Sequence, residues 1–183
     1  MKISVAIENF YQYAFPMPTV LVTCNDPQGK PNIVTIAWHT TLSRKPPLYG
    51  ISLASKRYSY ELIRKTKEFA VNFIPYELVR QAHFCGTHTG RKTDKIHETK
   101  LTLLPAQHIQ APLIKEAYAH LECTLKEEVL VGDHILLVGE VVAVHADDHA
   151  FVDDLLQIDR VQPLYYIGEN SYTTLNRFEK QEF

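Results

Sequence analysis

The chain has 183 residues, of which 45% are hydrophobic and 22% charged, as in a single globular domain with its own core. Its net charge of −2 excludes the strongly basic surface that nucleic-acid binding requires. No apolar run approaches the ~20 residues of a membrane span. Three widely spaced cysteines and an N-terminus unlike a signal peptide indicate a reducing compartment. We expect one cytoplasmic domain, 1–183, that binds neither nucleic acid nor membrane.

The first half of the chain predicts short strands with helices scattered among them. A helical face over 4–14, with Ser4 as its N-cap, comes first. Apolar runs then predict strands at 19–24, 32–39, 48–54 and 69–73, the first two joined as a hairpin by the turn at 25–29. Helices are predicted over 60–67 and 77–85, the second closed by Gly86.

A long hairpin is the clearest pattern of the second half. Apolar and polar residues alternate over 117–126, which predicts a half-buried strand. After Gly132 and Asp133, the run 135–144 is more apolar than 117–126 and predicts a more buried partner strand. This order of elements favours a β-barrel with short peripheral helices over a doubly wound parallel sheet.

The segment from Gly86 to Thr93 is similar to a phosphate-binding P-loop but departs from it. Three residues separate its glycines where four are needed, Arg91 precedes the lysine, and the preceding element is predicted to be helical. We interpret it as a cationic loop in which Arg91, Lys92 and Lys95 can contact a phosphate. The chain contains no Gly-x-Gly-x-x-Gly, which argues against a Rossmann site.

A metal site is the alternative for the histidines near this loop. His83, Cys85 and His88 have suitable side chains, and a metal-dependent hydrolase could use them. However, His83 and Cys85 are two residues apart on a predicted helix, so they face different sides. The sequence has no second pair of closely spaced ligand residues to complete a tetrahedral site. It therefore favours His83 at a helix end and Cys85 in the core.

Two segments are better candidates for a ligand site. Over 35–47 a strand runs into hydroxyl-rich residues and a double proline, where small side chains would let a flat ligand approach the backbone. Over 52–59 a strand delivers serines, Lys56 and Arg57 to a helix start, whose N–H groups and dipole attract anions. The alternatives are an ordinary strand-to-loop transition and solvated cations beside Ser59 as an N-cap.

Taken together in order, these segments resemble the flavin reductase-like family of FMN-binding split barrels, which includes the flavoredoxins. The resemblance covers about 16–175 and rests on joint order and spacing, because no single motif is specific. The matching segments are Pro18–Thr23, Gly29–Asn32, Thr35–Pro47, Ile51–Tyr60, Glu68–Phe73, His120–Cys123, Gly132–His134, Gly139–Val141 and Pro163–Gly168 with Tyr172.

The resemblance implies a six-stranded antiparallel split β-barrel with Greek-key features, mainly β with short peripheral helices, and a homodimer with FMN near the subunit interface. It places three groups of residues along the flavin. Beside the isoalloxazine ring come Thr35, Ile36, Ala37 and Trp38, largely through backbone groups, with Thr41 and Ser43 nearby and an aromatic residue at Tyr166, which could come from the partner. Along the ribityl chain lie Ser52, Ala54 and Ser55, and at the phosphate Arg57 and Ser59, with Lys92 or Lys95 in addition.

One departure from the family concerns the phosphate end. Many relatives have a threonine followed by an asparagine near this helix start, whereas Tyr58-Ser59-Tyr60 has Ser59 as its single hydroxyl apart from the tyrosines. The implied activity is hydride transfer from NAD(P)H to bound flavin, chemistry that belongs to the cofactor, so we assign no protein acid or base. Alternatives are a flavoredoxin-like FMN electron carrier that exchanges electrons with a redox partner protein, and a flavin-free relative that binds haem or another nucleotide.

Overall fold

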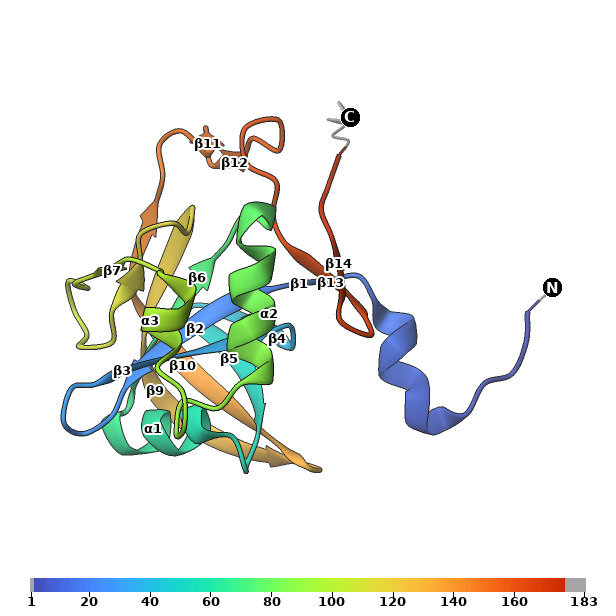
Figure 1. Ribbon diagram of the computed structural model, residues 1–183, viewed down its shortest axis with the longest axis horizontal. Helices are drawn as coiled ribbons and strands as arrows, with labels where there is room; N and C mark the ends of the chain where they lie inside the picture. The colour runs from blue at the N-terminus through green and yellow to red at the C-terminus, as the bar shows by residue number, and fades with distance from the viewer. Residues whose placement is uncertain (1, 177–183) are drawn as a thin grey trace.

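The computed structural model describes residues 2–176 and is mainly β (Figure 1). Seven antiparallel strands form one sheet in the order β3-β2-β6-β9-β10-β5-β4. Their bounds are β2 Val20–Asn25, β3 Pro31–Ile36, β4 His39–Arg44, β5 Pro47–Ala54, β6 Glu68–Phe73, β9 Ala119–Val131 and β10 His134–Ala146. This confirms the predicted split barrel, with seven strands in the sheet instead of six.

The edges of the sheet come together because β3 and β4, at its two ends, are consecutive in the chain. Only Ala37 and Trp38 separate them. The carbonyl oxygen of Trp38 accepts a 2.9 Å hydrogen bond from the N–H of Ser52, on β5, so pairing with β5 begins as soon as the chain leaves β3. The sheet therefore closes into a barrel. Residues 35–38 lie at the split, which is the place where the two edge strands β3 and β4 separate.

The additional strand explains where the predicted boundaries were wrong. The sequence predicted a strand over 32–39 followed by a hydroxyl-rich loop, whereas β3 ends at Ile36 and β4 runs over the hydroxyl-rich residues themselves. Because β4 is an edge strand with mostly exposed side chains, it has no apolar run to mark it. The predicted hairpins β2–β3 and β9–β10 are confirmed.

Two clusters of buried side chains lie on opposite faces of the sheet. The barrel interior contains Val22, Ile51, Phe69 and Leu137 among others. The second cluster lies outside the barrel, where Leu21 and Ile33 among others pack against η2 and α2. β2 and β3 are therefore buried on both faces, and α2 lies against β3 (Figure 1).

The helices largely agree with the predicted ones. α1 is Tyr58–Thr66, and a 3-10 turn, η2 (Tyr76–Leu78), leads into α2 (Val79–Thr87). Gly86 lies inside α2 and does not close it. A glycine suits this position because the helix lies close to β3: a Cβ on residue 86 would be 3.3 Å from the Cβ of Thr35. A short helix not predicted, α3 (Lys95–Thr99), is capped by Asp94.

The N-terminal helix differs from the prediction. It is a 3-10 helix, η1 (Ile7–Ala14), whose N-cap is Ala6 and not Ser4. Figure 1 shows that it projects away from the barrel, and within residues 2–176 it buries none of its side chains.

Shorter strands complete the described chain. β1 (Met17–Pro18), β13 (Tyr165–Gly168) and β14 (Ser171–Thr173) make a small second sheet beside the split. β7 (Leu103–Leu104) pairs with β8 (Leu113–Ile114), and β11 (Phe151–Val152) with β12 (Leu155–Leu156). Of the helices between residues 2 and 176, none has the length and apolarity to cross a membrane.

Candidate functional site

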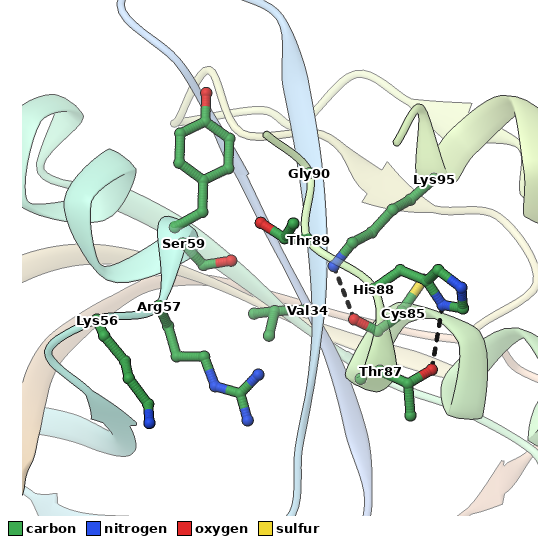
Figure 2. Close-up of a pocket in the computed structure, with 12 residues that line it drawn as sticks. Val34, Lys56, Arg57, Ser59, Cys85, Thr87, His88, Thr89, Gly90 and Lys95 are labelled. Atoms are coloured by element: carbon green, nitrogen blue, oxygen red, sulfur yellow. Dashed lines mark hydrogen bonds between the residues drawn. The ribbon is translucent and has the colours of Figure 1, made fainter. Parts of the chain in front are cut away.

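A cavity of about 290 Å³, here called the cationic cavity, lies between the start of α1, the end of α2 and the loop 88–94. Figure 2 shows Lys56 and Arg57 on one side of it and Lys95 on the other, with Val34 of β3 between them. In the described part of the chain, no carboxylate lines this cavity. An arrangement of three cations without a lining acid favours an anionic ligand.

The start of α1 contributes more than charge. Arg57 is its N-cap, and among residues 2–176 no side chain caps the first turn. The N–H of Tyr60 donates to the carbonyl oxygen of Arg57 (3.1 Å), but those of Tyr58 and Ser59 are available to an anion, and the helix dipole adds to the attraction. The turn is held in place by a 2.9 Å hydrogen bond from the N–H of Arg57 to the carbonyl oxygen of Ala54.

Ser59 is buried at the wall of the cationic cavity. Its Oγ accepts a 2.8 Å hydrogen bond from the side-chain amide of Asn32. Because a hydroxyl that accepts a hydrogen bond still has its own hydrogen, Ser59 can donate to a ligand oxygen. It is the second residue of α1, so its role as an N-cap, the alternative interpretation, is excluded.

Lys95 is the most deeply buried of the three cations, with 5% of its surface exposed. Its Nζ donates hydrogen bonds to the carbonyl oxygens of Ile33 (2.8 Å) and Cys85 (2.7 Å). Burial lowers the pKa of this amine below its ordinary value. No carboxylate among the described residues forms an ion pair with Lys95, so an anion in the cavity would supply its missing counter-charge.

A second cavity of about 320 Å³, here called the ring cavity, continues from the first along β3. The two share Arg57, Gly86 and Thr87, and the ring cavity adds Thr35, Ala37 and Tyr166 of the predicted residues. Cations at one end and mixed polar and aromatic walls at the other define a groove for a ligand with an anionic tail and a flat head.

The edge of β3 gives this groove a row of backbone hydrogen-bonding groups. The carbonyl oxygen of Ile33 points away from β2, since it accepts from Lys95. In an antiparallel strand the N–H and C=O of every second residue point to the same side, so those of Thr35 face the groove too. The hydroxyl of Thr35 is already used, because it donates to the carbonyl oxygen of Ala82 in α2 (2.5 Å).

Tyr166 reaches the ring cavity from β13. Its ring packs against those of Phe15 (centroids 5.2 Å apart) and Tyr172 (5.3 Å). This aromatic group therefore lines a cavity of its own chain.

A third cavity of about 410 Å³ lies on the other side of Ala37, between η1 and the barrel. It brings Ala37, Trp38 and Ser52 together with the rings of Phe10 and Tyr11. Three of the predicted residues therefore gather around the split in the barrel, although Trp38 and Ser52 lie outside the first groove.

The remaining predicted residues line neither the cationic nor the ring cavity of the described chain. Ile36 points its side chain into the barrel core, and its backbone N–H and C=O face β2, opposite to those of Thr35. Thr41 and Ser43 lie on β4, the edge strand at the opposite end of the strand order from β3. Ala54 and Ser55 support the turn that carries Arg57, and Lys92 is exposed to solvent.

Several groove residues were not predicted as ligand contacts. The end of α2 and the loop after it, including Gly86, Thr87 and Thr89, form a wall of the cationic cavity. The loop's likeness to a P-loop was a signal for this, since small and hydroxylic residues there suit a phosphate. Thr19, which follows β1, and Tyr172, on β14, also line the ring cavity; the resemblance included both in its matching segments without placing them at the ligand.

The metal-site alternative is not supported. His83 faces Tyr172, Cys85 is buried in the core, and His88 stacks on Phe84 with ring centroids 4.0 Å apart. Within residues 2–176 no three His, Cys, Asp or Glu side chains are placed to hold a metal ion.

The geometry agrees with comparisons to known proteins. Residues 12–175 match the family model described as "Flavin reductase like domain". An uncharacterized protein of Archaeoglobus fulgidus is 37% identical over 175 residues, covering 94% of this chain and 97% of the relative. The chain therefore belongs to the flavin reductase-like family, as the sequence predicted.

Solved structures with the same fold include flavin proteins. The flavoredoxin of Desulfovibrio vulgaris (Miyazaki F) superimposes with a TM-score of 0.89 at 28% identity, over 100% of this chain and 98% of that one. An FMN-binding protein from Thermus thermophilus, crystallised with 1-cyclohex-2-enone, gives 0.82 at 28% identity, over 98% of both chains.

Proposed function

We propose that this protein binds FMN in the groove along β3 and works as a flavin oxidoreductase. The observation that carries the proposal is the pairing of a carboxylate-free cationic cavity with a ring cavity on the free edge of a strand. FMN has a dianionic phosphate at one end and a flat ring with a polar edge at the other. Membership of the family and the FMN-binding structural neighbour support the same ligand.

The residues fit the two ends of FMN. Arg57 can bind a phosphate with two parallel hydrogen bonds, and the first turn of α1, Ser59 and Lys95 can complete its surroundings. At the other end, the backbone of Thr35 and Ala37 can donate to and accept from the polar edge of the ring, while Tyr166 packs against it.

The bound flavin would supply the redox chemistry, exchanging electrons with a donor and an acceptor. The chain's own part is to bind and orient the cofactor and to leave one side of it open. We infer that NAD(P)H is the electron donor, which makes the protein a flavin reductase. The alternative is a flavoredoxin-like electron carrier that exchanges electrons with a redox partner protein, as the flavoredoxin likeness suggests.

We also propose a homodimer in the cytoplasm. Apolar side chains are exposed on the β9–β10 hairpin and on β4, as are those of η1. They include Leu42, Leu130, Val131, Val142 and Val144. Burial against a second copy would remove this surface from water. Three buried free thiols suit a reducing compartment.

A visible spectrum of the purified protein tests the proposal. Oxidised-flavin absorption bands, with FMN as the released species, are expected. A colourless protein that does not take up added FMN would rule out the proposed function, and a haem spectrum would favour the flavin-free alternative. Anaerobic NADH or NADPH should bleach the flavin in a reductase, whereas a carrier would be reduced by chemical or protein donors and not by nicotinamide.

A further inference from the structure

The loop 88–94 forms one wall of the cationic cavity and is fixed at both ends. One end continues from α2, and the other enters α3, where Lys95 binds the carbonyl oxygens of Ile33 and Cys85. In Figure 2 the labelled Thr89 and Gly90 lie on this loop, between α1 and the Lys95 side of the cavity. The loop therefore borders the end of the groove that carries the positive charge.

The middle of the loop is attached to α1 by Arg91. Its guanidinium forms an ion pair with Glu61 and lies 4.6 Å above the centre of the Tyr58 ring. Arg91 is consequently turned away from the cationic cavity that its neighbours line. A cation that binds the ligand would point into the cavity. The orientation of Arg91 therefore indicates a role other than binding the ligand.

Gly90 brings the loop close enough for this attachment. A Cβ at Gly90 would overlap Oδ1 of the buried Asn32, so only glycine permits the loop to approach β3 this closely. Asn32 also binds Ser59, on the wall of the cavity. The loop, β3 and the start of α1 thus meet at one point beside the cavity.

We propose that Arg91 is a positioning residue that latches the loop 88–94 to α1 and thereby sets how fast the flavin leaves. This proposal rests on the proposed function. With the latch formed, the phosphate end is covered and the flavin is retained as a tightly held cofactor. With the latch open, the same groove would exchange flavin with solution and treat it as a diffusible substrate.

The chain offers a matched control. Lys65 also pairs with Glu61, at 3.0 Å, but it lies in α1 itself and forms no hydrogen bond or ion pair with the loop in the described structure. Arg91→Ala removes the latch, whereas Lys65→Ala removes a cation from the same carboxylate and leaves the loop attached. Both pairs are partly exposed, so each contributes little to overall stability.

The test is the rate of FMN release, followed as recovery of flavin fluorescence when the loaded protein is diluted. We expect Arg91→Ala to speed release about three- to tenfold, and Lys65→Ala by less than about 1.5-fold. Gly90→Ala, which forces the loop away from Asn32, should speed release as well. Raising the salt concentration should speed release from the wild type more than from Arg91→Ala, because salt screens the ion pair.

Hydrogen exchange of the loop amides in the flavin-free protein gives a readout that needs no ligand. Faster exchange over 88–94 in Arg91→Ala, with Lys65→Ala unchanged, is expected. Equal FMN release from wild type and Arg91→Ala would overturn the latch proposal, whether or not the exchange changes. A wild type that binds no FMN would instead overturn the proposed function, while the exchange data would still report whether Arg91 fixes the loop.

Discussion

Nζ of Lys95 lies 2.8 Å from the carbonyl oxygen of Ile33, which joins a buried ammonium group to the free edge of β3. The same ammonium lines the cationic cavity. We predict that Lys95→Met weakens FMN binding about ten- to a hundredfold, the usual loss for a charge-assisted hydrogen bond of about 1.5–3 kcal/mol. Titration of apoprotein with FMN and with riboflavin, which has no phosphate, measures this, and riboflavin affinity should change little.

Lys92→Met is the control for Lys95, because Lys92 is an exposed cation three residues earlier that lines neither cavity of the described chain. It should alter FMN affinity less than about twofold. Equal effects of the two substitutions would mean that Lys95 acts through general charge or through the fold. The sequence analysis gave Lys92 and Lys95 as equal candidates for the phosphate, because only the tertiary structure decides which of the two is buried.

The three cysteines, all buried and free in the described chain, should be unreactive in the folded protein. Burial raises the pKa of Cys24 and of Cys123 to about 12 and that of Cys85 to about 11, so almost no thiolate forms at neutral pH. A thiol reagent should label none of them under native conditions and all three in denaturant. A folded triple Ala or Ser variant that binds FMN but no longer reduces it would contradict the absence of a redox role.

Glu122 is a fully buried carboxylate at the centre of a hydrogen-bonded cluster. It accepts from the backbone N–H groups of Gln107 (2.8 Å) and His108 (2.7 Å) and from Nε2 of His145 (2.7 Å). Burial alone would raise its pKa, but these donors outweigh burial and hold the pKa below its usual value. The carboxylate therefore attaches the segment 107–108 to β9 and β10.

A lowered pKa means that the stabilisation is complete above the unfolded value of about 4.3 and is lost as the pH falls through the folded value. We predict that Glu122→Gln lowers the free energy of unfolding at pH 7 by about 2–3 kcal/mol, since an amide cannot accept all three bonds. Urea unfolding at several pH values should show this difference shrinking below pH ~4. Glu116→Gln, which removes a half-buried carboxylate bound to the N–H of Thr102, should cost less.

Local pattern was enough to predict the barrel and the position of Arg57 at a helix start. A strand that buries one face has alternating apolar and polar residues, as in β9, and a strand that is more fully buried has an apolar run, as in β2, β6 and β10. These patterns can be read in the sequence of each strand alone. Arg57 was found because a helix start and its cap are local features. The edge strand β4 was missed since nothing apolar marks it.

Contacts between distant segments could not be predicted in the same way. Lys95 meets Ile33 across 62 positions of the chain, and Arg91 meets Glu61 across 30. Neither segment contains a local pattern that points to the other, so the sequence left Arg91, Lys92 and Lys95 as cations that could all contact a phosphate. The structure instead buries one cation at the cavity, uses one to bind α1 and leaves Lys92 in solvent.

The protein is predicted to be a homodimer in solution. In the described chain, η1 buries none of its residues, and Val144 is 65% exposed on β10, so an isolated copy would leave much apolar surface in water. Light scattering at micromolar concentration should give twice the 21.0 kDa chain mass. A monomer that still retains FMN would refute the prediction and show that one chain completes the groove.

Arg57 provides the sharpest test of which end of the groove takes the phosphate. It is the one predicted residue that lines both the cationic and the ring cavity, and it caps a helix whose N–H groups face the same space. If it were a solvated surface cation, its removal would have almost no effect. We predict that Arg57→Ala weakens FMN binding by about 1.5–3 kcal/mol, about ten- to a hundredfold, while riboflavin binding barely changes. Titration of both ligands into wild-type and variant apoprotein decides the matter, because equal losses for the two would mean that Arg57 supports the ring or the fold and that Lys95 alone carries the phosphate.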